Sequence, residues 1–314
     1  MKITSYENFS KYLSILLNES HTDHWLKYKN TSIDLILDGG AFSGSYLLGG
    51  LIYLSNISSH LRIERISGTS VGSLFGLLYL CDHISKFNYK FYKKFRKCFK
   101  KKGNLSVLKH CLRFLKKYIP NDFYLFCNNK LYITFYDIDQ KKQILQFIYS
   151  SNDDVISAVY KSCFIPLLIN GKISIENKYI DGIYPYIFPE SGCKHVIFMD
   201  LHSNYLNKMI NIKNEKNNHH RILCGIFETH HFFMYGSSCL CSNFYKNKHY
   251  YYCIFKIRKT IAQYIVSILH LFQKYYLTPI KNNKNSLYIY KYIITHFKNI
   301  FPYIIKLIAN NYLI

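Results

Sequence analysis

The sequence predicts an α/β fold in three layers, with a mostly parallel or mixed sheet between helices. Two units carry this prediction. In each, a short apolar strand runs into a glycine-rich turn, and a helix with an apolar face follows directly. The first unit comprises residues 33–57 and the second residues 61–81.

The composition fits a large globular domain. The chain has 314 residues, of which 49% are hydrophobic, so core material is plentiful and global disorder is excluded. Its 41 Lys and Arg against 18 Asp and Glu give a formal net charge of +23. Such a charge favours anionic partners such as membrane surfaces, nucleic acid or acidic proteins. AT-rich codon usage, which enriches Lys, Asn, Ile, Tyr and Phe, is an alternative source of part of this charge that needs no partner.

Cysteine usage and hydropathy indicate the compartment. The ten cysteines form no paired framework, and a chain of this size needs no disulfides, which predicts reduced thiols. We find no signal peptide and no apolar run of about 18 residues that would span a bilayer. We therefore expect an intracellular, cytosolic protein, with peripheral membrane association left open.

The elements follow in order. Residues 1–31 resemble a helical lead-in. A buried strand at 33–37 and a helix at 45–57 form the first unit. The second has a strand at 61–66, a turn at 68–72 and a helix at 73–81.

A basic stretch follows the second unit. Residues 86–117 contain thirteen Lys or Arg and no Asp or Glu. Within them Phe87, Phe91, Phe95 and Phe99 recur every four residues, which places them on one helical face. This face predicts either core packing with a solvated lysine side, or docking of the region from Lys86 to Lys102 on an anionic membrane.

Further strands and helices follow. We predict strands at 123–127, 130–138 and 142–150, and a helix at 153–163 capped by Asn152 or Asp153. Strands are also expected at 178–183 and 195–200. Beyond residue 204 we expect a loop at 211–220 and basic, aromatic helices near 257–277 and 286–312. The expected organisation is a lead-in at 1–31, a main domain at 32–204, and a mostly helical basic region at 205–314.

Three motifs stand at strand ends. The loop DGGAFSG runs from Asp38 to Gly44, GTSVG surrounds Ser70, and Asp181 opens the sequence DGI after the segment SCFIP. A serine on a tight strand-to-helix turn presents its oxygen to a substrate, but needs a base to remove its proton. Backbone N–H groups of a glycine-rich loop at a helix start can hold the resulting oxyanion. An aspartate within hydrogen-bond reach can be the base.

This set of motifs closely resembles the patatin-like phospholipase family, over roughly residues 33–201. The resemblance implies the patatin-like α/β fold and a lipid acyl hydrolase of the phospholipase A or lipase type, working through an acyl-serine intermediate. It implies Ser70 as nucleophile and Asp181 as general base, a dyad without histidine. It implies no metal and no organic cofactor. The remaining implied residues are the oxyanion-hole residues Gly39, Gly40 and Ala41, the elbow glycines Gly68 and Gly72, and the supporting residues Asp38, Gly44 and Gly182.

The sequence departs from the family pattern at three positions. Ala41 stands where a third glycine is usual, which adds a methyl group and restricts φ. Ser43 stands where Arg or Lys is common, which removes a charge from the loop. Ile183 replaces the usual Gly or Ala after the Asp-Gly pair, which adds bulk beside the base.

Alternatives remain. In the first, the protein is a hydrolase scaffold that has lost its activity and uses its basic surface to bind membranes. Nucleic acid is the less favoured partner of such a scaffold. An acyltransferase would use the same dyad. The substrate's head group and the oligomeric state are left open. A Ser-His-Asp triad would need one of the histidines of the main domain, and a metal site would need the histidine and cysteine pairs beyond residue 218. The histidines available for a triad have no recognisable sequence context; they are His60, His83, His195 and His202. The residues available for a metal site fit no standard ligand spacing; they are His219, His220, His230, His231, Cys239 and Cys241.

Overall fold

A mixed β-sheet forms the centre of the molecule in the computed structural model, which describes residues 13, 15–16, 23–190, 195–212, 215 and 217–272. The strand order is β4-β3-β2-β1-β6-β7, with β5 also paired to β3. The four inner strands are parallel to one another, and β4, β5 and β7 pair antiparallel. The strands are β1 (Thr31–Leu37), β2 (Leu61–Thr69), β3 (Leu131–Asp137), β4 (Lys142–Gln146), β5 (Tyr179–Asp181), β6 (His195–Met199) and β7 (Cys241–Asn243).

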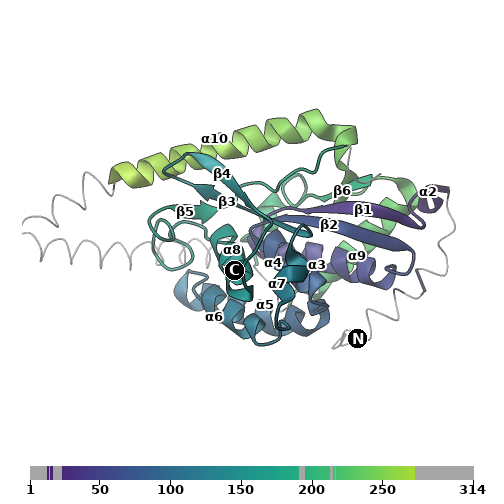
Figure 1. Cartoon of the computed structure of the whole chain (residues 1–314), viewed down its shortest axis with the longest axis horizontal. Helices are drawn as coiled ribbons and strands as arrows, with labels where there is room; N and C mark the ends of the chain where they lie inside the picture. Colours follow the sequence, from purple (N-terminus) through teal and green to yellow (C-terminus); the bar gives the residue numbers. More distant parts are fainter. Residues whose placement is uncertain are drawn as a thin grey trace, which may run out of the picture.

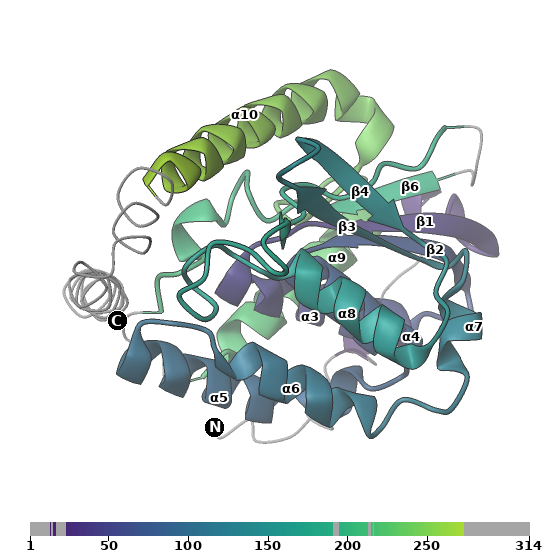
Figure 2. The same ribbon diagram turned by 60° about the vertical axis from the view of Figure 1, so that its left-hand side comes forward.

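Helices cover both faces of the sheet (Figures 1 and 2). One long helix, α10, crosses the first face, and the other helices lie on the second, with α5 and α6 outermost. This arrangement confirms the predicted three-layer α/β fold. The helices are α2 (Asp23–Leu26), α3 (Gly44–Asn56), α4 (Val71–Leu80), α5 (Ile84–Lys102), α6 (Val107–Lys116), α7 (Phe123–Cys127), α8 (Asn152–Ser162), α9 (His219–Tyr235) and α10 (Lys248–Phe272), with the short 3₁₀ turns η1 (Ala41–Ser43), η2 (Leu206–Lys208) and η3 (Phe244–Asn247).

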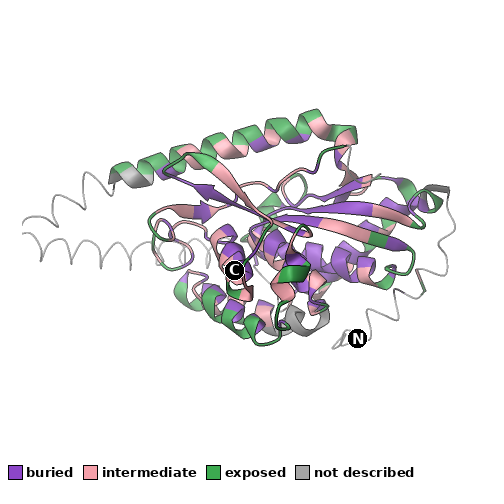
Figure 3. Cartoon of the chain, in the orientation of Figure 1, coloured by how far each residue is buried: buried purple, intermediate pink, exposed green. Residues whose placement is uncertain are grey.

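Strand β1 explains why its sequence is apolar on both sides. Leu35 and Leu37 pack into the core between the sheet and the helices of the second face. Ile36 points the other way, into a cluster that includes Phe198 of β6 and Phe255 of α10. The side chains of Leu35, Ile36 and Leu37 are fully buried. Figure 3 shows the buried inner strands between outer helices that are largely exposed. A parallel strand covered on both faces has this continuous apolar pattern.

The prediction of a strand at 123–127 was wrong, because these residues form helix α7. A five-residue apolar run is compatible with either structure, and periodicity alone does not separate them. Asp122 has φ 57°, which turns the chain into the helix, and Asn152 Oδ1 accepts the Tyr124 N–H at 2.9 Å. Only Cys127 of α7 is fully buried, while Leu125 is 59% exposed.

The predicted cap of the following helix was wrong by one residue. The cap of α8 is Ser151, whose hydroxyl oxygen accepts the Asp154 N–H at 3.2 Å. Asn152 instead joins α8 to the preceding loop, donating to the Pro120 carbonyl at 2.8 Å. The strands predicted at 33–37, 61–66, 130–138, 142–150, 178–183 and 195–200, and the helices at 45–57 and 73–81, are all present within a few residues of their predicted bounds.

Beyond residue 204 the structure adds elements that we did not predict. Helix α9 packs along α3, and strand β7 pairs with β6. The helix predicted near 257–277 is present as α10, which begins earlier, at Lys248. The helix predicted near 286–312, residues 273–277, and most of the lead-in at 1–31 lie outside the described residues.

Within the described part of the chain, no helix combines the length and apolar character needed to cross a bilayer.

Candidate active site

Ser70 lies on a strained turn between β2 and α4. Its backbone has φ 51° and ψ −128°, a conformation that residues other than glycine rarely adopt. Gly72 makes the turn feasible, because a Cβ there would lie 2.4 Å from the Leu37 carbonyl oxygen. The predicted strand, turn and helix around Ser70 are therefore present, with the side chain at the helix N-terminus, where negative charge is favoured.

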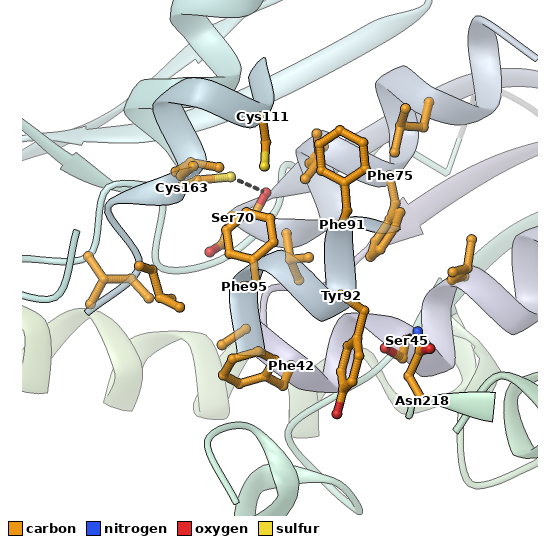
Figure 4. A pocket seen from close by; sticks show the side chains of 18 of the residues that line it. Phe42, Ser45, Ser70, Phe75, Phe91, Tyr92, Phe95, Cys111, Cys163 and Asn218 are labelled. Atoms are coloured by element: carbon orange, nitrogen blue, oxygen red, sulfur yellow. Dashed lines mark hydrogen bonds between the residues drawn. The ribbon is translucent and has the colours of Figure 1, made fainter. Parts of the chain in front are cut away.

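Two neighbours in sequence, Ser162 and Cys163, hold this turn from the other side. The Ser162 hydroxyl accepts the Ser70 N–H at 2.8 Å, and the Cys163 thiol donates to the Ser70 carbonyl at 3.0 Å (Figure 4). The Ser73 hydroxyl donates to the same carbonyl at 2.7 Å. These bonds fix the strained backbone through the N–H and carbonyl groups of Ser70 and do not use its hydroxyl.

Asp181 reaches the same place from the end of β5. Gly182 packs so closely on the turn that a Cβ there would lie 2.5 Å from Thr69 Oγ1. One carboxylate oxygen of Asp181 accepts the Ile183 N–H at 3.0 Å. The other, Oδ2, is buried and accepts no hydrogen bond of standard geometry from the described residues. The structure thus brings Asp181 beside the turn that carries Ser70, with one oxygen available.

Burial of the Asp181 carboxyl raises its pKa to about 6. The nearby Ser70 hydroxyl, the Ile183 N–H and His202 act in the opposite direction, and the charge of Asp38 adds to the increase. A carboxylate with a pKa just below neutral is ionised at pH 7 yet holds a proton well enough to act as a base.

The loop at Asp38–Ala41 lies against Ser70. A Cβ on Gly39 would lie 3.0 Å from the Ser70 Cβ. The Gly39 N–H is already donated to Asp38 Oδ1 at 2.9 Å. Among the described residues, none accepts a hydrogen bond from the N–H of Gly40 or Ala41. Of the three residues predicted for the oxyanion hole, these two have free donors.

Ala41 adopts φ 43°, in the left-handed region. This conformation costs an alanine roughly 1–2 kcal/mol. We expect Ala41→Gly to raise the free energy of unfolding by about 0.5–1 kcal/mol, because relief of the strain exceeds the added entropy of the unfolded chain. Urea denaturation of both proteins measures this difference. A variant less stable than the parent would show that the alanine methyl contributes packing that outweighs the strain.

An apolar cavity opens beside Ser70, with about 920 Å³ of empty space including its mouth (Figure 4). Ser70 stands at one side of it, and Ser45 and Asn218 form a polar spot elsewhere on the wall. The remaining wall is almost wholly hydrophobic, with residues from α3, α4, α5 and α6. Its apolar side chains include Phe42, Leu48, Val71, Leu74, Phe75, Leu78, Phe91, Phe95, Leu105, Leu108, Leu115, Ile165 and Ile169.

The phenylalanine face of α5 is therefore directed inward. Phe91 and Phe95 line the cavity, and Phe99 is 1% exposed. The side chain of Phe87 lies outside the described residues. Phe91, Phe95 and Phe99 therefore face the protein interior, and contact of the lysine face of α5 with anionic lipid stays a prediction.

The chain is similar to known proteins over about half of its length. The family model "Patatin-like phospholipase" matches residues 35–184. Residues 35–184, slightly less than half of the chain, are therefore similar to a patatin-like phospholipase domain. The "Omega-hydroxyceramide transacylase" of Mus musculus is 25% identical over 176 residues, which are 51% of this chain and 28% of that protein's length. This family indicates lipid hydrolase or acyltransferase chemistry.

Residues beyond the match complete the surroundings of the patatin-like domain. Asp38 is 0% exposed, and its carboxylate pairs with the Arg258 guanidinium of α10 and with His202 Nδ1 at 2.7 Å. Although burial alone would raise it, Arg258 and His202 hold the pKa of Asp38 well below its ordinary value. Asp38, Asp200 and His202 are close enough to ligate a metal ion, but the Arg258 guanidinium already neutralises the same carboxylates.

Sequence reasoning missed two of these residues. His202 was considered only as a base for Ser70, whereas it pairs with Asp38 of the patatin-like domain. Arg258 carries no motif and lies 220 residues from Asp38 along the chain. The departure at Ser43, which removes a charge from the loop, was the only sequence signal that a cation would have to come from elsewhere.

Proposed function

We propose that the protein is a lipid acyl hydrolase in which Ser70 is the nucleophile and Asp181 the general base. One observation carries the proposal. A serine on a strained turn lies between a carboxylate with a free, buried oxygen and a loop with two free N–H donors, beside an apolar cavity. Each of these groups supplies one requirement of acyl transfer.

The reaction follows from the positions of these groups. Asp181 Oδ2 accepts the hydroxyl proton as Ser70 Oγ attacks the ester carbonyl carbon. The N–H groups of Gly40 and Ala41 donate to the oxyanion that forms. When the intermediate collapses, the ester C–O bond breaks, Asp181 returns the proton to the leaving alcohol, and Ser70 is acylated. Water then attacks the acyl-serine while Asp181 accepts its proton. When this second intermediate collapses, the bond to Ser70 Oγ breaks, Asp181 returns the proton to Oγ, and the fatty acid is released.

The cavity supports an acyl chain as the part of the substrate that is recognised. Among the described residues that line it, the side chains are mostly hydrophobic and none is Lys, Arg, Asp or Glu. Each methylene that enters such a space contributes about 0.8 kcal/mol of transfer free energy. We therefore propose esters of long-chain fatty acids, in phospholipids or acylglycerols, as substrates.

Acyl transfer to an alcohol is the second candidate function. The mouse relative is named a transacylase, and the same acyl-serine would react with an acceptor hydroxyl in place of water. The two activities differ only in the second step. Mass spectrometry of the products formed from a lipid ester, with and without an added long-chain alcohol, distinguishes a free fatty acid from a new ester.

We expect a fluorophosphonate probe to label the wild-type protein and Ser150→Ala equally, and not to label Ser70→Ala. The probe reacts only with an activated serine, and Ser150 is an exposed serine that does not line the cavity. In-gel fluorescence of the folded proteins, with and without anionic vesicles, measures the labelling. A folded wild type that does not label under either condition would favour the inactive scaffold that binds membranes or nucleic acid.

A further inference from the structure

The oxyanion loop of this protein lacks the cation that is common in the family's motif. Ser43 occupies that position, and its hydroxyl donates to the Tyr205 carbonyl at 3.1 Å. A cation nevertheless reaches the loop, from the opposite face of the sheet. Arg258 of α10 donates from Nη1 to Asp38 Oδ1 at 2.9 Å and from Nη2 to Asp38 Oδ2 at 3.2 Å.

Asp38 transmits this contact to the loop. Its Oδ1 atom, which accepts from Arg258, also accepts the Gly39 N–H at 2.9 Å. Its Oδ2 atom pairs with His202 Nδ1 at 2.7 Å and accepts the Leu201 N–H at 3.4 Å. The Asp38 carboxylate thus holds Gly39 in place. Gly39 directly precedes Gly40 and Ala41, whose N–H groups are free among the described residues. Gly39 itself lies against Ser70.

Helix α10 does not depend on Arg258 for its attachment. Tyr251 and Phe255 are buried in a cluster with Ile36 and Phe198 of the sheet. Val266 is buried farther along the helix with Ile180 of β5. These apolar contacts are sufficient to hold α10 on the sheet. The bidentate ion pair between Arg258 and Asp38 is therefore not needed to attach the helix, and it can position the loop.

We propose that Arg258 is a positioning residue for the oxyanion loop, acting through Asp38 in place of the cation that Ser43 does not provide. The proposal rests on the proposed function, since it assigns the loop its catalytic role. It also gives α10, which lies outside the region matched by the family model, a part in the active site. The patatin-like domain of this chain is then incomplete without residues up to at least 258.

The physical reason is the cost of a buried, unpaired carboxylate. Asp38 is fully buried, and of the two side chains that pair with its carboxylate, the charge of Arg258 lowers its pKa more than the charge of His202 does. Without the guanidinium, the carboxylate must rotate toward other donors or take up a proton, and either change releases Gly39. A displacement of the loop by a fraction of an ångström moves its N–H groups away from the oxyanion.

The first test follows the loop itself and needs no activity. Amide hydrogen exchange, read by mass spectrometry, compares the wild type with Arg258→Met, Arg258→Lys and the control Lys256→Met, which removes an exposed cation from the same helix. We expect exchange in the peptide covering residues 38–42 to be about tenfold faster in Arg258→Met, intermediate in Arg258→Lys, and unchanged in the control. Unchanged exchange at 38–42 in Arg258→Met would overturn the proposal, as would equal acceleration throughout the sheet.

The second test follows the chemistry. With a soluble long-chain nitrophenyl ester, we expect Arg258→Met to lower kcat by about 10–100-fold with KM within a few-fold of the wild type, because the acyl cavity is untouched. Arg258→Lys should recover part of the loss, since an ammonium replaces the charge but not the two-point contact. Two results would overturn the positioning role of Arg258. One is a fall in kcat accompanied by an equal weakening of substrate binding in the cavity, and the other is a kcat equal to that of the Lys256→Met control.

A double variant separates this proposal from the proposed function. If Arg258 acts through Asp38, Asp38→Asn combined with Arg258→Met should be no slower than the slower single variant. Multiplicative losses would show independent roles and overturn the proposal. A wild type that neither labels nor hydrolyses any ester would contradict the proposed function instead, and the exchange measurement would then still decide whether Arg258 holds the loop.

Discussion

Asp181→Asn is expected to slow acylation of Ser70 by about 10²–10⁴-fold, because the amide cannot accept the hydroxyl proton. The substitution is nearly isosteric, so the Ile183 N–H keeps an acceptor and the loop geometry is preserved. The rate of labelling by a fluorophosphonate measures the effect. Asp139→Asn, which changes an exposed carboxylate in a turn, is the matched control and should label at the wild-type rate.

The pH dependence of the wild type tests the same assignment. Burial raises the pKa of Asp181 to about 6, and only the ionised form is a base. The rate should therefore be nearly constant above pH 7 and fall about tenfold for each pH unit well below 6. A profile that stays flat down to pH 5 would show that a different group accepts the proton.

The Asp181→Asn variant should also be more stable than the wild type at neutral pH. A carboxyl with an ordinary pKa of 3.8 when unfolded and about 6 when folded binds its proton more tightly in the folded state. The free energy of unfolding therefore decreases as pH rises from about 4 to about 6, and the deficit persists above that range. Asparagine has no charge to bury, so Asp181→Asn should gain up to about 3 kcal/mol at pH 7.5 and little at pH 4.

Urea denaturation at the two pH values measures this gain. Loss of activity together with gain of stability is the behaviour of a group that is placed for chemistry at the expense of the fold. A variant that is less stable than the wild type at pH 7.5 would indicate that Asp181 holds the structure together, and the base would have to be sought elsewhere.

The sequence was sufficient to predict that the three motifs meet. Each follows a strand, and the ends of neighbouring strands lie at one edge of a sheet, so Asp38 and Ser70 had to be close. The position of Asp181 was less certain, since β5 has three residues and pairs antiparallel with β3, Asp181 lying opposite Phe135. The resemblance, rather than strand geometry, gave Asp181 its predicted role.

The second half of the site could not be predicted. Arg258 reaches Asp38 only because α10 crosses the sheet at one angle, and no local pattern encodes that angle. The sequence periodicity of α10 indicated a helix. It did not indicate that Arg258 would be the side chain that contacts the buried Asp38 carboxylate. Likewise the phenylalanines of α5 fit a core or a membrane equally well in sequence, and the position of α6 beside them decides that they line a cavity.

Gly49→Ala is expected to lower the free energy of unfolding by about 3 kcal/mol or more, through the contact between α3 and α9. A Cβ at Gly49 would lie 2.0 Å from the Ile222 carbonyl oxygen, and one at Gly225 would lie 2.1 Å from the Tyr46 carbonyl oxygen. The two helices cross backbone to backbone, so neither can accommodate a methyl group by turning a side chain. Overpacking of this kind usually costs about 1–3 kcal/mol, and a clash with backbone lies at the upper end.

Gly50→Ala is the matched control, one residue along the same helix. A Cβ there would meet the Thr229 hydroxyl at 2.7 Å and the Met199 terminal methyl at 2.9 Å, which are side-chain atoms and not a backbone carbonyl. The gain of about 1 kcal/mol in helix propensity from Gly to Ala offsets much of that cost. Thermal and urea unfolding should therefore rank wild type and Gly50→Ala well above Gly49→Ala. Equal stabilities would mean that α9 is not held against α3. Because α3 starts at the loop proposed to hold the oxyanion and carries part of the cavity wall, the loss in Gly49→Ala should extend to labelling of Ser70.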